Sequence, residues 1–216
     1  MICSFENKKI GDYGVANNGF TTGDNERFLR IWYEVCRDNI CLNANSIDDA
    51  MSSKRRWFPY NKGGSFRKWY GNNDYVINWY NDGQDIKAYG HLVPRSMKYQ
   101  FRKSISWSKI SSSVSSFKIK EKGTMFDVAG LSLFPHNQND FEYLLALCNS
   151  CFAQKCLDFL SPTLNYETGH ISAIPVIKDN DSVDVVNLIS EENISLTQKD
   201  WDSFETSWDF KKHPLI

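Results

Sequence analysis

The sequence predicts an α+β fold in which a twisted, mainly antiparallel sheet packs against a long helix. Short β-prone runs separated by turn residues follow one another from residue 104 to 128. Residues 139–160 instead repeat apolar side chains at helical spacing. The length of 216 residues, with 41% hydrophobic and 24% charged residues, suits one domain with an appendage. We therefore expect one domain over residues 1–177, followed over 178–216 by an acidic linker and the start of a helical region.

The first strand is expected over residues 27–35. Apolar and polar side chains alternate there, although Phe28, Trp32 and Val35 could also form one face of a helix. Residues 19–25 precede this segment and read as a turn, because their glycine, Asn and Asp residues favour left-handed and hydrogen-bonded conformations.

The middle of the chain contains further strand candidates. Residues 75–80 form one of them. Residues 81–83 then either turn a hairpin or cap a short helix over 84–89. The serine-separated runs that follow predict an antiparallel meander; they cover residues 105–110, 117–120 and 125–128.

The longest helix is expected to begin near Asn139 or Asp140 and to end near Leu160, before Pro162. Its apolar residues recur every three or four positions, so one broad face should pack on the sheet.

The C-terminal quarter is expected to be less regular. Residues 161–177 read as a loop followed by a short strand, and residues 178–195 as an acidic linker. Thr197 and Asp200 then resemble a capping box that opens a final helix.

The charges are unevenly distributed along the chain. Residues 54–122 contain 15 Lys or Arg against four acids, a net charge of +11, while the whole chain carries −1. Such a block attracts phosphates and polyanions, and nucleic acid is the natural partner. The alternative is that these cations are solvated and paired with acids from the flanks. Aromatic residues alternate with the cations, so we expect the aromatics in the core and the cations together on one exposed surface.

The cysteine count and the N-terminus bear on the compartment. Six cysteines without a recognisable export signal are expected to be reduced thiols, and the absence of a long apolar run argues against a membrane span. The chain is therefore expected to be cytoplasmic.

Other chemistries have weaker signals. Cys148 and Cys151 form a Cys-x-x-Cys pair, but with no second pair and with scattered histidines they read as helix core rather than a metal site. The tripeptide 85–87, with Asp74 or Asp82 upstream, matches a minimal metal-dependent nuclease pattern that is common by chance. Neither a dinucleotide-binding nor a phosphate-loop signature is present.

Several segments resemble one protein family. Residues 57–72, continued by 75–79, closely resemble the C-terminal part of large adenine-specific DNA methyltransferases of the BREX phage-defence type, the PglX-like proteins. Residues 19–28 look like the entry to their target-recognition domain. The likeness to the PglX-like proteins extends over further segments, which are 105–108, 126–130, 165–175 and 200–210. The exit from the long helix also resembles specificity domains of type I and type IIG restriction systems.

The resemblance implies a role in DNA recognition but no catalysis by this chain. The family's S-adenosylmethionine loop and its Asn-Pro-Pro-Tyr type motif are both missing, so no cofactor or catalytic residue is expected here. S-adenosylmethionine is expected for the full-length parent. The expected partners are double-stranded DNA, the parent's methyltransferase domain and other defence-system proteins.

The leading hypothesis is a sequence-specific DNA recognition module of an adenine-N6 methyltransferase. Its rivals are a protein-docking module using the acidic segment 179–209, and a nuclease centred on Asp85 and Lys87. The residues expected to contact DNA are Lys54, Arg55, Arg56, Asn61, Lys62, Arg67, Lys68, Asn72, Asn73, Lys98, Arg102 and Lys103.

Overall fold

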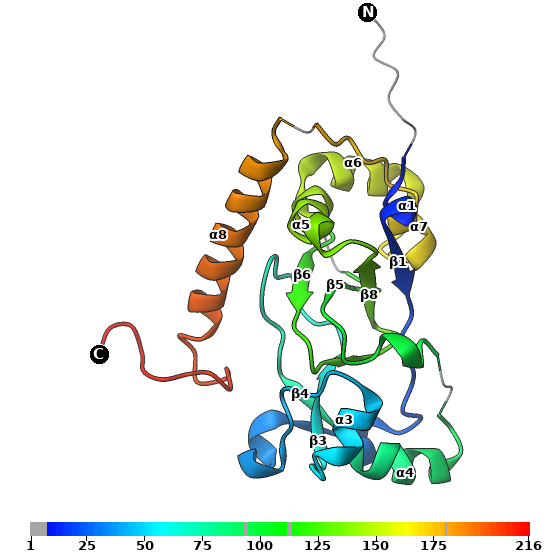
Figure 1. Ribbon diagram of the computed structural model, residues 1–216, viewed down its shortest axis with the longest axis vertical. Helices are drawn as coiled ribbons and strands as arrows, with labels where there is room; N and C mark the ends of the chain where they lie inside the picture. The colour runs from blue at the N-terminus through cyan, green and yellow to red at the C-terminus, as the bar shows by residue number, and fades with distance from the viewer. Residues whose placement is uncertain (1–7, 93–94, 112–113, 180) are drawn as a thin grey trace, which may run out of the picture.

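A computed structural model describes residues 8–92, 95–111, 114–179 and 181–216, and within these ranges it contains two four-stranded sheets (Figure 1). The α+β class is confirmed, with mainly antiparallel strands and packed helices. The strands are divided between two sheets, however, and each sheet has its own hydrophobic core.

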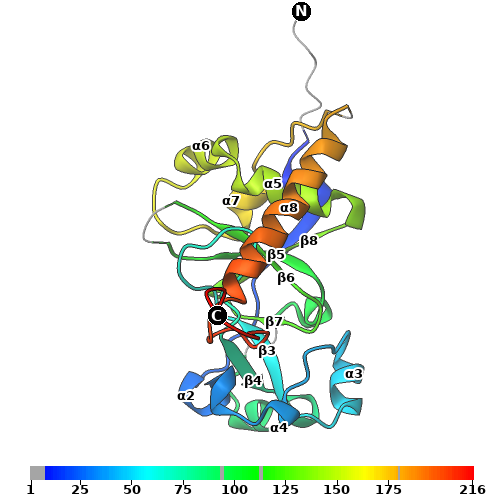
Figure 2. The same cartoon turned by 90° about the vertical axis from the view of Figure 1, so that its left-hand side faces the viewer.

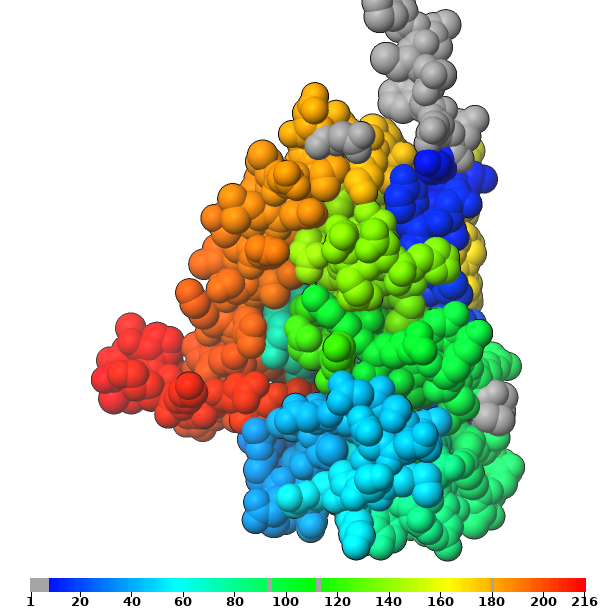
Figure 3. All heavy atoms as spheres, in the orientation of Figure 1, coloured from blue at the N-terminus to red at the C-terminus, as the bar shows by residue number. Residues whose placement is uncertain are grey.

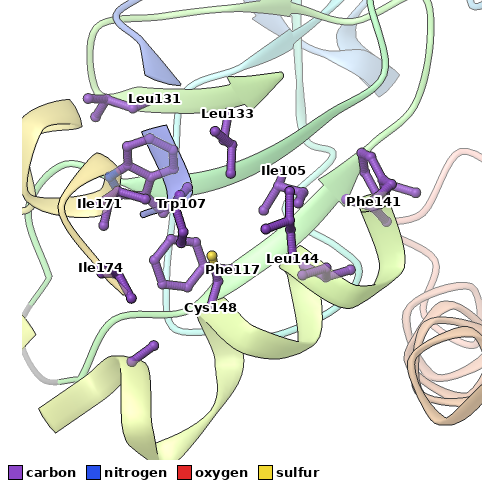
Figure 4. Packing of buried hydrophobic residues seen from close by; sticks show 14 of the residues in the cluster. Ile105, Trp107, Phe117, Leu131, Leu133, Phe141, Leu144, Cys148, Ile171 and Ile174 are labelled. Atoms are coloured by element: carbon purple, nitrogen blue, oxygen red, sulfur yellow. The ribbon is translucent and has the colours of Figure 1, made fainter. Parts of the chain in front are cut away.

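The first sheet is antiparallel throughout. Its order is β1 (Gly14–Asn17), β8 (Gly130–Pro135), β5 (Ser104–Ser108) and β6 (Phe117–Lys120). Trp107 pairs with Leu131 on one side and with Phe117 on the other, which places these three side chains on one apolar face. Figure 4 shows this face packing against helical side chains such as Leu144 and Cys148.

The opposite face of the first sheet is polar and is also buried. Ser106 lies between Ser132 and Lys118 in the register, and all three are fully buried. The segment 61–74 covers this face. Asn61 Nδ2 donates to Ser106 Oγ at 2.6 Å, and Lys120 Nζ donates to the carbonyls of Gly71 and Asn72. Polar side chains can be buried here because the covering segment supplies hydrogen-bond partners to most of them.

The second sheet lies at the other end of the molecule and carries the second core (Figure 2). Phe58, Ile77, Trp79 and Phe101 are fully buried there. β7 pairs parallel with β3, and the other pairs are antiparallel. The order is β2 (Leu29–Ile31), β4 (Tyr75–Asn78), β3 (Trp57–Asn61) and β7 (Met125–Phe126), with helices α2 (Asn25–Phe28), α3 (Ile47–Ser52) and α4 (Tyr80–Tyr89) nearby.

The strand predicted over 27–35 is wrong for most of its length. Asp24 caps a short helix by accepting from Arg27 N at 3.0 Å, and the strand covers only β2. The chain then enters the 3-10 turn η1 (Trp32–Glu34), where the Trp32 indole donates to the Thr206 carbonyl at 2.8 Å. This long-range bond was not visible in the local pattern.

The short-helix alternative after residues 75–80 is confirmed. β4 ends at Asn78, and Asn81, Asp82 and Gly83 all have positive φ before the chain becomes helical up to Tyr89. A Cβ at Gly83 would meet the Trp79 ring at 2.8 Å, so this tight turn requires glycine.

The predicted meander is partly correct. β6 matches the expected residues 117–120, while β5 ends at Ser108 and β7 at Phe126. β8 was not predicted, although Leu131 and Leu133 alternate with Ser132 and the strand pairs with both β1 and β5.

The long helix over 139–160 is broken into α5 (Phe141–Asn149) and α6 (Cys151–Leu160). Ser150 adopts an extended conformation between them, and its hydroxyl accepts from Ala153 N at 3.1 Å. In place of the predicted strand, the next segment forms α7 (Thr168–Ser172), and Pro175 makes only an isolated bridge to Lys9.

The predicted acidic linker is wrong, because residues 178–195 include most of α8 (Val183–Trp201), which packs along α5 (Figure 1). The capping box is wrong too: Thr197 lies inside α8, where its hydroxyl donates to the Asn193 carbonyl at 2.7 Å. Turns follow Trp201 where a final helix was expected. In the described residues no helix is long and apolar enough to cross a membrane. The remaining short elements are α1 (Ile10–Tyr13), η2 (Arg37–Asn39), η3 (Met97–Tyr99) and η4 (Gln138–Asp140).

Candidate nucleic-acid interface

Two of the expected DNA contacts are buried amides. Asn61 bonds Ser106 Oγ and donates to the Gly130 carbonyl at 2.9 Å, and Asn72 Nδ2 donates to the Ser65 carbonyl at 2.9 Å. Both side chains are almost completely buried. They hold the glycine-rich segment 61–74 in place and do not face solvent.

Several of the expected cations are engaged inside the protein or with carboxylates. Lys62 pairs with Asp127 at 3.4 Å and Lys103 with Glu142 at 3.4 Å. Lys68 Nζ donates to the Asn149 carbonyl at 2.8 Å. These three cations therefore already have internal partners.

Arg67 is held by the C-terminal part of the chain. Its guanidinium pairs with Asp200 at 2.9 Å and lies 5.0 Å from the centre of the Trp201 ring. Both contacts join the glycine-rich segment to the end of α8, so Arg67 connects these parts of the fold.

Arg56 and Asn73 also contact other side chains of the protein. Arg56 lies 3.6 Å from Asp85, and both side chains remain about half exposed. Asn73 Oδ1 accepts from Lys120 Nζ at 2.5 Å.

The remaining expected residues, Lys54, Arg55, Lys98 and Arg102, are exposed cations without a carboxylate partner among the described residues. The expectation that all the cations share one exposed surface is therefore wrong. Two of the amides are buried, and several cations are paired with acids from elsewhere in the chain, as the alternative reading proposed.

One group of cations does converge, at a groove of about 350 Å³ between the two sheets. Arg102, Lys103 and Lys122 line it together with the amide side chains of Asn45 and Gln138. In Figure 3 the light blue and green segments that border it meet on the face turned to the viewer. Arginine and amide side chains are the groups that read guanine and adenine edges, and lysines suit phosphates.

The Tyr99 ring supports the cations at this groove. Lys98 Nζ lies 5.1 Å from the ring centre and Arg102 Cζ lies 5.6 Å from it. The centre of the Tyr99 ring lies 4.8 Å from the centre of the Phe134 ring, and Phe134 lines the groove. These cation-π contacts leave both side chains exposed, and of the two Arg102 lines the groove.

Three residues of the groove, Asn45, Lys122 and Gln138, were not among the expected DNA contacts. Lys122 was counted in the basic block, but residues 45 and 138 lie far from it in sequence. Gly123 fixes the position of this lysine in the structure. A Cβ on Gly123 would lie 2.0 Å from the Leu42 carbonyl oxygen, so the turn packs directly on the segment before α3.

Side chains of the nuclease alternative already pair with other residues. Lys87 forms an ion pair with Asp82, and Asp85 contacts Arg56 and accepts from Asn78 Nδ2 at 3.4 Å. Among the described residues no three His, Cys, Asp or Glu side chains are placed to share a metal ion.

The two cysteines of the Cys-x-x-Cys pair lie in different surroundings. Cys148 is buried in the first core, and burial raises the pKa of its thiol to about 12. Cys151 begins α6 and is exposed. Cys148 therefore behaves as a small core residue.

Two lysines of the basic block are buried on β6. Lys120 Nζ donates to the carbonyls of Gly71 and Asn72 at 2.9 and 2.8 Å. Lys118 Nζ has no hydrogen-bond partner among the described residues. Burial lowers the pKa of both groups, to about 8 for Lys118. Lys120 fastens the first sheet to the segment that leads into β4.

The chain is similar to part of two curated methyltransferases. It is 39% identical over 208 residues to the adenine-specific methyltransferase PglX of Lacticaseibacillus casei (strain Zhang), covering 93% of this chain. It is 34% identical over 198 residues to the adenine-specific methyltransferase BrxX of Escherichia coli O9:H4 (strain HS), covering 91%. The chain is homologous to a segment of these enzymes. It spans only 17% and 15% of their lengths. No protein-family model matches the chain.

Proposed function

We propose that this chain is a sequence-specific DNA recognition module of a PglX-like adenine-N6 methyltransferase in a BREX phage-defence system. The groove between the two sheets receives the duplex, and the methyl transfer, with S-adenosylmethionine, belongs to the rest of the parent protein. The observation that carries the proposal is the convergence of Arg102, Lys103 and Lys122 with the amides of Asn45 and Gln138.

The chemistry of this groove suits a nucleic acid better than a neutral ligand. Arg102 and Lys122 have no carboxylate partner among the described residues, so their charges are available to phosphates. Lys54 and Arg55, beyond α3, would add to the attraction at long range. The partial homology supports the assignment, because both relatives are named adenine-specific methyltransferases and adenine is a base of DNA.

Substituting Arg102 or Lys122 tests this function. We expect Arg102→Ala and Lys122→Ala each to weaken binding of a short duplex by ~1–3 kcal/mol if the side chain contacts bases or phosphates. Loss of one phosphate contact should also reduce the slope of log affinity against log salt by about 0.9. Fluorescence anisotropy of the chain with labelled duplex, measured at several salt concentrations, gives both quantities.

Lys155→Ala is the matched control, because Lys155 is an exposed cation on α6, away from the groove. It removes the same charge and should change affinity little. Equal losses in all three variants would mean that net charge alone governs binding. No duplex binding by the unsubstituted chain would contradict the proposal directly.

A second candidate function, protein docking, is favoured by α8. Val185, Leu188, Ile189 and Leu196 are 50–63% exposed and recur at helical spacing along the side that α5 does not cover. We propose that another part of the parent methyltransferase packs on this stripe, since a row of large exposed apolar side chains marks an interaction surface.

The docking candidate is tested by adding the remainder of the parent enzyme as a separate polypeptide. Leu188→Ser with Leu196→Ser should weaken their association at least about tenfold, the equivalent of ~1.4 kcal/mol. Sedimentation velocity measures the complex. Replacing Ser195 by alanine, an exposed position on α8, is the control. Undiminished association of the double serine variant would exclude the stripe as the docking surface.

A further inference from the structure

A pocket of about 370 Å³ lies along α6 and shares no residue with the groove between the two sheets. Figure 2 shows α6 at the edge of the molecule, beside α7. One wall of this α6 pocket is the helix itself, and the other is the segment that follows α7. Its apolar lining residues are Phe152, Cys156, Phe159, Leu160, Ala173 and Pro175, and Lys155 also lines it.

Both walls of the α6 pocket are held by the fold. Cys156 and Leu160 pack against the first core. The opposite wall is tied to the start of the described chain, where Ile10 N donates to the Ile174 carbonyl at 2.9 Å and Val176 N donates to the Lys8 carbonyl at 2.8 Å. The pocket is therefore preformed, which lowers the entropic cost of filling it.

Phe159 forms a projection next to this hollow. It is 87% exposed, although it also lines the α6 pocket. The same surface thus carries an apolar projection and an apolar hollow. A two-fold axis can bring such a surface onto itself, so that the projection of each copy enters the hollow of the other. This surface therefore suits a second copy of the chain.

The charges on α6 favour an antiparallel arrangement of the two copies. Lys155 and Asp158 are both exposed, and Lys155 forms no ion pair among the described residues. Asp158 Oδ1 accepts from Gln154 Nε2 at 2.8 Å, which leaves its other oxygen available. If Phe159 lies against Cys156 of an antiparallel second copy, Lys155 is offset from Asp158 of that copy by two residues, about 3 Å along the helix axis. A lysine side chain is long enough to span this offset, and the two-fold axis produces the pair twice.

We propose that α6 forms a two-fold symmetric contact between two copies of this chain, with Phe159 of each copy in the α6 pocket of the other. A second copy fills the hollow, covers the projection and pairs both charges at the same time. The inference is independent of the proposed function, because neither the groove between the sheets nor the apolar stripe on α8 takes part in it.

The contact is expected to be weak. One helix face and one pocket are a smaller surface than the roughly 800 Å² per partner of a standard stable interface. Two copies should therefore associate only at high protein concentration. At the low concentrations suited to measurements of DNA binding and of denaturation, the chain should be monomeric.

Sedimentation velocity of the 216-residue chain at concentrations from about 5 to about 500 µM tests the contact. The average sedimentation coefficient of the unsubstituted chain should rise with concentration. Phe159→Asp should remove this rise, because it places a carboxylate in the apolar pocket of the other copy. Phe204→Asp is the matched control, since Phe204 is also exposed, at 51%, but does not line the pocket. Circular dichroism shows whether both variants are folded.

A charge exchange tests the antiparallel arrangement. Lys155→Glu should weaken self-association about tenfold, because it opposes Asp158 of the second copy in both symmetric contacts. Adding Asp158→Lys to the same chain should restore it. Lys155→Glu with Glu191→Lys is the control, because Glu191 is exposed on α8 and its substitution restores the net charge without restoring the pair.

The outcomes separate this inference from the proposed function. A sedimentation coefficient of the unsubstituted chain that does not change with concentration would overturn the inference and leave DNA recognition untouched. Self-association that survives Phe159→Asp would place the contact elsewhere and overturn it as well. Equal recovery with Asp158→Lys and with Glu191→Lys would overturn the antiparallel pairing, because net charge alone would then explain the loss.

Discussion

Replacing Trp107 by alanine is expected to lower the free energy of unfolding by about 3–5 kcal/mol, the usual cost of truncating a large aromatic residue in a core. Trp107 is fully buried at the centre of the first sheet, between Phe117 on β6 and Leu131 on β8 (Figure 4). Its indole also donates to the Tyr166 carbonyl at 2.8 Å. Truncation would therefore leave a cavity and remove the hydrogen bond from the indole to the Tyr166 carbonyl.

Urea denaturation followed by circular dichroism measures this loss. Phe159→Ala is the matched control, since Phe159 is also an aromatic residue that contributes to the helical layer but is 87% exposed. It should change stability by less than about 0.5 kcal/mol. A similar small effect for Trp107→Ala would mean that the first core does not depend on this ring.

The period of the apolar residues was sufficient to predict the α+β class and the helical face of residues 139–160. Phe141, Leu144 and Leu157 are fully buried as that spacing requires. The break at Ser150 was not predicted, because the apolar spacing continues across it. The only local sign of the break is Ser150 itself, because serine is a preferred N-cap residue and here its hydroxyl caps α6.

α8 was missed because its apolar residues are divided between two faces. One face packs on α5, where Ser190 Oγ donates to the Glu142 carbonyl at 3.0 Å, and the other carries the exposed Leu188 and Leu196. A helix with apolar residues on two sides and many acids has no single apolar stripe, so the segment resembled a linker.

The candidate site depended on information that a linear charge count does not contain. Counting charges located the basic block. Lys118 and Lys120 alternate with Phe117 and Ile119, however, which is the pattern expected of a strand that exposes its lysines to solvent. They are buried because the segment 61–74 covers that face of the sheet. The groove likewise joins residues that are up to 93 positions apart, from Asn45 to Gln138.

Lys118→Met is expected to stabilise the protein near neutral pH by ~3 kcal/mol. This figure is the free-energy equivalent of the lowering of the Lys118 pKa from 10.5 to about 8. Lys118 is completely buried and its ammonium has no hydrogen-bond partner among the described residues. Burial is the main cause of the shift, and the positive charge of Arg67 adds to it. Methionine keeps the length of the side chain and removes the charge.

The pH dependence distinguishes a buried charge from a simple packing effect. The pKa of Lys118 is about 8 in the folded protein and 10.5 in its ordinary state. Below pH 8 the folded and unfolded chains both hold the proton, so the cost of the buried charge is complete. Between pH 8 and 10.5 the unfolded chain binds more protons, and stability rises with pH. The advantage of Lys118→Met should therefore shrink over this window.

Urea midpoints of both proteins, measured at about pH 7 and about pH 10, test this expectation. Lys122→Met is the control, because Lys122 follows the same strand but is exposed, and it should alter stability little at either pH. Lys120 contributes in the same direction, because burial and then the Lys118 charge lower its pKa. The variant removes this repulsion as well, so the advantage of Lys118→Met still declines as the pH rises. A destabilising Lys118→Met, or an advantage that does not change with pH, would mean that the ammonium has a counter-charge or hydrogen bonds in solution and is not an uncompensated charge.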